Sequence, residues 1–238
     1  MNQRIFDIQS IILISSTILN FLVFLYLVFN KSRSYSKTQK HLSIATLGVS
    51  LWILSSWINH FSDDKLIVTF FTRMAFSSTV LTMIELFLFS SSFKFKFKSF
   101  PFRVFGVLIF ILTQFSDLVV KEGIPATTYQ SEGTVYGDGF AAWSILILIM
   151  AIFLIATLVS VLVSAKGVKK AQISLIFSLF VLSIALVIIF NLVLPNFGIN
   201  SFIFVGQYST FIFALGSAWV IVQEKIYSLK YILSNILA

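Results

Sequence analysis

The stretch FAAWSILILIMAIFLIATLVSVLV, residues 140–163, contains no Asp, Glu, Lys or Arg. An α-helix of about 20 apolar residues crosses the roughly 30 Å hydrocarbon layer of a bilayer, so this stretch predicts a membrane-spanning helix. Six further apolar stretches have comparable lengths, at Ile8–Phe29, Leu42–Phe61, Leu66–Ser90, Phe102–Val120, Ile173–Leu194 and Phe202–Val222. We therefore expect an all-α integral membrane bundle of seven helices.

The composition is that of a membrane protein. Hydrophobic residues make up 58% of the chain and charged residues 11%, and the mean hydropathy is +0.98. The formal net charge of +8 comes from residues that flank the apolar stretches, where anionic lipid headgroups are the natural partner. We expect the lipid bilayer, and no nucleic acid, as a partner.

The basic residues collect in alternate loops, which gives the bundle an orientation. One side of the predicted bundle carries 13 of the 17 Lys and Arg residues: Lys31, Arg33, Lys37, Lys40, Lys94, Lys96, Lys98, Arg103, Lys166, Lys169, Lys170, Lys225 and Lys230. The other side carries Arg4, Lys65 and Lys121 with the acidic residues Asp7, Asp63, Asp64, Asp117, Glu122, Glu132 and Asp138. Short basic loops stay in the cytoplasm, so we expect a multi-pass plasma-membrane protein with an extracellular N-terminus and a cytoplasmic C-terminus.

The external segment Lys121–Gly139 is the one loop long enough to form a surface of its own. Thr127–Gln130 and Thr134–Tyr136 within it have the β-branched and aromatic content of a small hairpin. We therefore expect a hairpin between the fourth and fifth helices.

Small residues predict which helices pack closely, because lipid provides no hydrophobic drive for helix association. They recur every four residues in three stretches: Gly206, Thr210, Ala214 and Ala218; Ala156, Ser160 and Ser164; and Thr46 and Ser50. We expect these three helices, the seventh, fifth and second, to form the centre of the bundle.

Two ionisable residues, Arg73 and Glu85, fall inside the third apolar stretch. Twelve residues of helix separate them by about 18 Å and 120° of rotation, so they cannot pair with each other. Arg73 either reaches the outer headgroups, pairs with Asp117, Asp63 or Asp64, or holds an anionic ligand. Glu85 either bonds to another helix or a cytoplasmic Lys, or senses protons.

Polar residues of the last two stretches complete the set of candidates for ligand binding or signal coupling. Gln207 and Tyr208 belong to this set, together with Arg73, Glu85 and Asp117. The alternative for Gln207 and Tyr208, and for Asn191 and Gln172, is a structural hydrogen bond between helices.

Catalytic motifs are missing from the sequence. The seventh stretch has no Lys for a retinal Schiff base, and neither a His-Glu-x-x-His motif nor a Gly-rich phosphate loop occurs. Cys is absent, and His41 and His60 are near opposite ends of one predicted helix, which argues against a metal cage. We expect no enzyme activity, catalytic residue, cofactor or metal.

Short motifs near the C-terminus resemble those of one known family. They are Lys169–Lys170–Ala171–Gln172–Ile173 before the sixth helix, Leu194–Pro195 at its end, Ala218–Trp219–Val220–Ile221–Val222, and Lys225–Ile226–Tyr227–Ser228–Leu229. With Leu51–Trp52 and Arg73, they are similar to the N-terminal seven-transmembrane sensor region of bacterial histidine kinases. The resemblance covers essentially the whole chain. The sequence departs from the family at Tyr227–Ser228, where the family has Phe-Asp. This departure lies in the segment that would couple the exit helix to an output domain.

The resemblance implies a sensor of a two-component signalling system. Residues 1–223 would form the sensor bundle and residues 224–238 a cytoplasmic signalling helix, with Trp219, Lys225, Tyr227 and Leu229 in the signal exit. A stimulus outside or within the membrane would be relayed to a cytoplasmic histidine kinase or response regulator. We expect the output domain on a separate chain, or a truncated or degenerate family member. Ligand and dimerisation stay open.

Two alternatives to a sensor are a small-solute transporter and a membrane scaffold that binds a partner through its helices. No internal repeat or pair of broken helices is visible, and few polar residues are expected along a path, which argues against a transporter.

Overall fold

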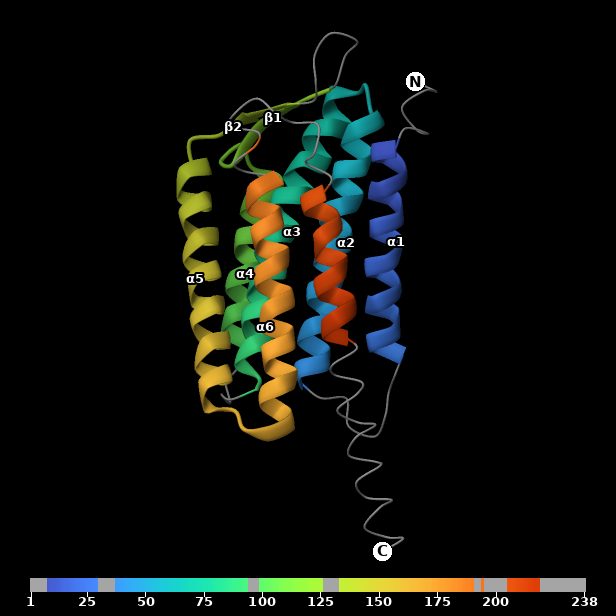
Figure 1. Cartoon of the computed structure of the whole chain (residues 1–238). Helices are drawn as coiled ribbons and strands as arrows, with labels where there is room; N and C mark the ends of the chain where they lie inside the picture. Colours follow the sequence, from blue (N-terminus) through green and yellow to red (C-terminus); the bar gives the residue numbers. More distant parts are fainter. Residues whose placement is uncertain are drawn as a thin grey trace, which may run out of the picture.

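The computed structural model describes residues 8–29, 37–93, 99–125, 133–190, 194 and 205–218. The elements are α1 (Ile8–Phe29), α2 (Lys37–Phe61), α3 (Lys65–Ser91), α4 (Ser99–Phe115), β1 (Val120–Ile124), β2 (Gly133–Tyr136), α5 (Phe140–Ser164) and α6 (Gly167–Ile188), and residues 205–218 are also helical. The helices run roughly side by side, and the β1–β2 hairpin lies across one end of the bundle (Figure 1).

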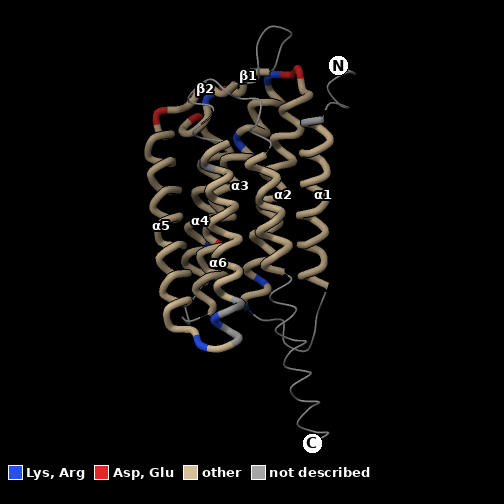
Figure 2. The backbone as a smooth tube through the Cα atoms, viewed as in Figure 1, with Lys and Arg blue, Asp and Glu red and all other residues tan. Residues whose placement is uncertain are grey.

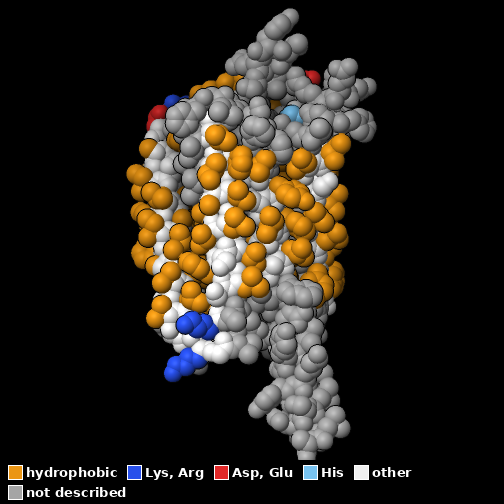
Figure 3. Space-filling model, viewed as in Figure 1, with side chains coloured by type: hydrophobic (Ala, Val, Ile, Leu, Met, Phe, Trp, Pro, Cys, Tyr) orange, Lys and Arg blue, Asp and Glu red, His pale blue; other side chains and the backbone are white. Residues whose placement is uncertain are grey.

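The surface of this bundle is suited to lipid. Four helices are long and apolar enough to cross a membrane: Ser10–Phe29, Lys37–Phe61, Lys65–Ser91 and Phe140–Ser164. Two shorter apolar helical stretches are α4 (Ser99–Phe115) and the part of α6 from Ile173 to Val187. Apolar side chains cover the visible side of the molecule between its two ends (Figure 3), and most of the coloured charges on the backbone tube lie near those ends (Figure 2). The described part of the chain is therefore mainly helical, with four candidate membrane spans.

Helix α3 is the centre of the described bundle, since it packs against α2, α4, α5 and β1. Buried polar side chains are about as numerous in this interior as buried apolar ones. Many are hydroxyls that donate to their own helix, as Thr46 does to the carbonyl of Ser43 and Thr82 to that of Ser78. Gly48 of α2 faces Thr82, and any Cβ there would collide with the Thr82 hydroxyl. Small residues thus let α2 and α3 approach closely.

The expected packing stripe on α5 is wrong, whereas the other two stripes are largely buried. Ala156 and Ser164 are exposed, and α5 instead buries Leu154, Leu158 and Val161. Large apolar side chains gain more dispersion contact against a neighbouring helix, so α5 packs through them and lies at the periphery. Thr46 and Ser50 of α2 are buried, as are Gly206, Ala214 and Ala218 of the last helix.

The fourth helix is shorter than the sequence predicts. It ends at Phe115 rather than at Val120, because Val120 begins strand β1 and pairs with Tyr136 of β2. The strands are antiparallel, with Ile124 opposite Gly133 and a register irregularity between Val120 and Glu122. The predicted strand at Thr134–Tyr136 is confirmed, and the Thr127–Gln130 piece lies outside the described residues.

Candidate functional site

Three charged or titratable side chains from different helices meet inside the bundle. Glu85 of α3 accepts a hydrogen bond from Arg103 Nε of α4 at 2.6 Å through Oε1, and a second from Arg103 Nη2 at 3.2 Å through Oε2. His41 of α2 lies with Nδ1 2.6 Å from Glu85 Oε2. A carboxylate accepts only, so the His41 Nδ1–H is the donor of that bond. We call His41, Glu85 and Arg103 the ion cluster.

Burial makes the ion cluster an interdependent unit. The side chains of His41 and Glu85 are 8% and 5% exposed, and that of Arg103 is 28% exposed. An isolated carboxylate at this depth would be very unfavourable, and the two-bond contact with Arg103 compensates its charge. A change in the spacing of α2, α3 and α4 would therefore have to break or remake these bonds.

Local sequence explains how the ion cluster forms. His41 lies one turn into α2, Arg103 lies one turn into α4, and Glu85 lies less than two turns before the end of α3. Because α2 and α4 begin at the end of the bundle where α3 finishes, all three residues reach the same depth. Nearby bonds connect the same end: Gln39 Nε2 donates to the carbonyl of Leu27 in α1 at 2.6 Å, and the hydroxyls of Thr38 and Ser92 are 2.7 Å apart.

At the other end of α3, Arg73 attaches the hairpin to the bundle. Its Nε donates to the carbonyl of Val120 at 3.0 Å, and its Nη2 donates to the carbonyl of Lys121 at 3.1 Å and to the Asp117 carboxylate. The pairing with Asp117, one of the expected alternatives, is present. Asp64 instead caps α3, where its Oδ1 accepts the backbone N–H of Leu66 at 2.7 Å.

Further contacts dock the hairpin. The N–H of Gly123 donates to Thr69 Oγ1 at 3.0 Å, and a Cβ at Gly123 would lie 2.8 Å from the Val68 carbonyl carbon. The Tyr136 ring stacks on Phe140 with centroids 3.9 Å apart. Partial burial raises the pKa of the Tyr136 hydroxyl above its ordinary value. The hairpin is thus held by α3 and by the start of α5.

The remaining candidates are not part of either arrangement. Gln207 is buried and its Nε2 donates to Ser56 Oγ of α2 at 2.6 Å, whereas Tyr208 is exposed with its ring centroid 6.2 Å from that of Phe211. The expected signal exit residues Trp219, Lys225, Tyr227 and Leu229 lie outside the described part of the chain.

Among the five expected binding or coupling residues, only Arg73 and Asp117 contact each other. The expected hydrogen bond between Glu85 and another helix is present, but the sequence does not predict His41 or Arg103 as the partner. The sequence does contain one signal for the pair of Glu85 and Arg103, the position of Glu85 within a membrane span. A carboxylate inside the membrane needs a cation at the same depth, and Arg103 is the basic residue closest to the apolar part of the fourth helix.

Within the described residues, no group of three or more His, Asp and Glu side chains could hold a metal ion. The ion cluster combines a carboxylate, an imidazole and a guanidinium, and the chemistry of these groups is proton exchange, charge compensation and reversible contact between helices. No protein-family model matches the chain, and no curated protein sequence matches it.

Proposed function

We propose that this protein is a seven-span membrane sensor that relays an external or intramembrane stimulus to a cytoplasmic kinase. The observation that carries the proposal is the position of α3. This helix holds the hairpin through Arg73 at one end and the ion cluster through Glu85 near the other. A single rigid element thus connects a surface loop to a buried charge network about 18 Å away.

Charge supports an orientation with the hairpin outside. The described charges at the hairpin end include five acidic residues, Asp63, Asp64, Asp117, Glu122 and Asp138. The described residues at the opposite end include the basic Lys37, Lys40, Arg103, Lys166 and Lys170, and the acidic Glu85 of the ion cluster. Basic loops are retained in the cytoplasm, so the N-terminus is outside and the C-terminus inside. The proposal takes α4, α6 and the helical residues 205–218 as the three further spans.

The relay works by a small displacement of α3. Binding or movement at the hairpin shifts α3 through the fork of hydrogen bonds from Arg73, and the shift changes the distance between Glu85 and its partners on α2 and α4. Packed helices have discrete arrangements, so such a shift switches the bundle between two states. The resemblance of the C-terminal motifs to histidine-kinase sensor regions supports an exit through residues 219–238.

A chimaera tests the relay. A histidine-kinase catalytic core is joined after Ala238 in heptad phase with Ile226, Leu229 and Leu233, and one to four residues are inserted at the junction. We expect kinase activity that rises and falls with the phase of the insertion and that changes in Glu85→Gln. Activity that ignores both the phase and Glu85→Gln would contradict the proposal.

Transport is the second candidate, and the polar interior favours it. Ser16 Oγ and Asn20 Oδ1 of α1 are buried without a hydrogen-bond partner among the described residues. The sequence suggested few polar residues along a path, and the abundance of buried polar groups weakens that objection. In proteoliposomes with a trapped pH-sensitive dye, proton flux that is lost in Glu85→Gln would favour transport over signalling.

A further inference from the structure

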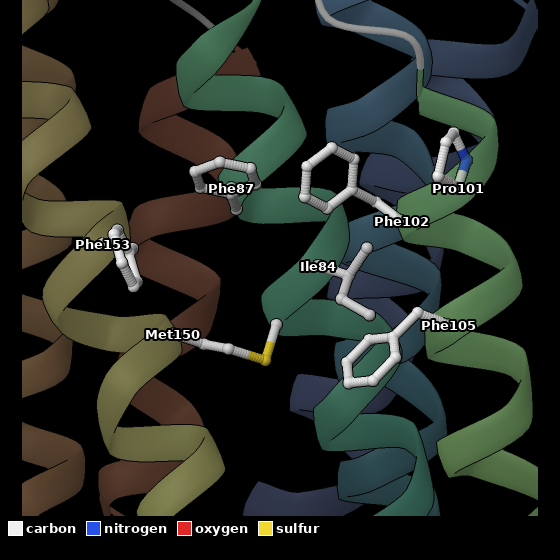
Figure 4. Close-up of a pocket in the computed structure, with 7 residues that line it drawn as sticks. All are labelled: Ile84, Phe87, Pro101, Phe102, Phe105, Met150 and Phe153. Atoms are coloured by element: carbon white, nitrogen blue, oxygen red, sulfur yellow. The ribbon is translucent and has the colours of Figure 1, made fainter.

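A pocket of about 540 Å³ lies in the side of the bundle between α3, α4 and α5 (Figure 4). Ile84 and Phe87 of α3 form its floor. Phe102 and Phe105 of α4 form one wall, and Met150 and Phe153 of α5 form the other. The lining side chains are all apolar, and the volume is typical of a small-molecule site.

Helix packing explains the pocket. Gly106 lets α4 lie close to α3, because a Cβ at this position would be 2.5 Å from Ile84 Cδ1. Helix α5 also packs on α3, with Trp143 and Met150 against the buried cluster that includes Val80 and Ile84. A hollow remains between α4 and α5 over the surface of α3. The Phe87 and Phe102 rings, with centroids 5.5 Å apart, lie together in the lining (Figure 4).

The mouth of the pocket belongs to the lipid-facing surface. Phe105 and Phe153 at the mouth are 45% and 60% exposed, and the neighbouring exposed side chains on the same helices include Leu108, Leu148 and Ile152. In a bilayer, hydrocarbon chains rather than water cover such a surface. An empty apolar hollow loses dispersion contacts on all its walls, and an acyl chain that enters restores them.

We propose that this pocket binds one acyl chain of a membrane phospholipid. The chain enters from the leaflet at the basic end of the bundle, because Phe87 lies one turn before the end of α3 and Pro101 lies in the first turn of α4. Recognition is of the hydrocarbon chain rather than of the headgroup, since the described side chains that line the pocket are all apolar.

The pocket and the ion cluster share the same two helices at consecutive positions. Ile84 lines the pocket and Glu85 bonds to Arg103, while Phe102 lines the pocket and the next residue is Arg103 itself. Successive residues of a helix point about 100° apart, so the α3–α4 pair has the pocket on one side and the ion cluster on the other. A chain between α4 and α5 therefore sets the position of α4 relative to α3. This link makes the acyl chain an input of the sensor, a step that rests on the proposed function.

Photolabelling tests the site without using any signalling output. The full-length protein is reconstituted in vesicles that contain a phospholipid with a diazirine on one acyl chain, and the labelled residues are mapped by mass spectrometry. We expect the floor residue Ile84 to be labelled more strongly than the exposed Leu148. Met150→Trp fills the pocket from α5, because the Met150 side chain reaches toward α3 (Figure 4), and it should reduce Ile84 labelling several-fold. Leu148→Trp is the matched control on the same helix and should leave Ile84 labelling unchanged.

Phe153→Trp provides a second block at the mouth in case Met150→Trp fails to fold. Labelling of Ile84 that is no stronger than at Leu148, or that survives a folded blocking variant, would overturn the site whatever the function of the protein.

In the kinase chimaera, Met150→Trp should shift the activity while Leu148→Trp does not. A chimaera that responds to Glu85→Gln and ignores Met150→Trp overturns the pocket as an input, whereas one that ignores every variant counts against the proposed sensor.

Discussion

Arg103 Nε lies 2.6 Å from Glu85 Oε1, and this contact joins α4 to α3 inside the bundle. Arg103 also reaches the other carboxylate oxygen, and its Nη2 lies 3.4 Å from His41 Nδ1. A guanidinium presents its donors in a planar fork, so this two-bond contact fixes an angle between the helices as well as a distance. The pair therefore governs how α4 sits on α3.

Removal of either partner of this pair should destabilise the protein. In Glu85→Ala, Arg103 and His41 lose their carboxylate, and we expect a loss of roughly 3 kcal/mol in the free energy of unfolding in detergent. Arg103→Ala should have a similar effect, because it leaves a buried carboxylate with His41 alone. The double variant should lose about 1 to 3 kcal/mol less than the two single losses combined.

The exposed pair between Lys65 and Glu122 is the control for this cycle. Its nitrogen and oxygen are 2.5 Å apart, but the two side chains are 60% and 39% exposed, so solvent weakens the attraction. Glu122→Ala should change stability by less than about 1 kcal/mol. Strict additivity of Glu85→Ala and Arg103→Ala would mean that the two groups do not depend on each other.

Much of the helical fold was predictable because lipid imposes a simple rule on length and polarity. The sequence predicts Ile8–Phe29 and Phe140–Val163 to within one residue, since both begin and end where long apolar stretches do. It fails at Val120, because an apolar residue can continue a helix or start a strand, and only the partner Tyr136 decides between them.

The candidate site was less predictable, since it depends on contacts between distant residues. Depth alone identifies Arg73 and Glu85 as residues that need partners, but not which partners they have. Two of the bonds from Arg73 go to backbone carbonyls of Val120 and Lys121, and a sequence carries no signal for a backbone acceptor. Depth does not identify His41 of the ion cluster, because His41 lies near the basic start of its helix rather than inside an apolar stretch.

Arg73 should be required for hairpin docking. In Arg73→Ala both bonds to the hairpin backbone are lost, and we expect faster amide hydrogen exchange across β1. Arg73→Lys should restore part of the protection, because one ammonium cannot reproduce the fork of the guanidinium. Asp117→Asn should have a small effect, since Asp117 is 76% exposed and both backbone bonds remain. Equal exchange in wild type and Arg73→Ala would show that other contacts hold the hairpin.

Two glycines of the hairpin should respond differently to a methyl group. A Cβ at Gly123 would lie 2.8 Å from the Val68 carbonyl carbon and 2.9 Å from the Thr69 nitrogen. Gly123→Ala must push β1 away from α3, and we expect a loss of about 1 to 3 kcal/mol in stability. Among the described residues, a Cβ at Gly133 meets only Ile124, at 3.6 Å, so Gly133→Ala should be tolerated. Similar melting temperatures for the two variants would contradict the docked position of β1.

Gln207 should contribute to helix packing, whereas its neighbour Tyr208 should not. Gln207 is 4% exposed and bonds to Ser56, so Gln207→Leu leaves the Ser56 hydroxyl without this partner, at a loss of roughly 0.6 kcal/mol or somewhat more. Tyr208 is 40% exposed, and Tyr208→Phe removes only a hydroxyl from the surface. Thermal unfolding in detergent compares the two. A larger effect of Tyr208→Phe would point to a binding role for this side chain.

The proposed orientation can be measured directly because the chain contains no cysteine. Single cysteines are introduced as Glu132→Cys between the hairpin strands and Lys166→Cys between α5 and α6, the loops at opposite ends of α5. A membrane-impermeant maleimide should label Glu132→Cys in intact cells and Lys166→Cys only after permeabilisation, since basic loops are retained inside. A fluorescent protein that folds only in the cytoplasm, fused after Ala238, should fluoresce. The reversed labelling pattern would invert the orientation, and labelling of both cysteines from the same side would mean that α5 does not cross the membrane.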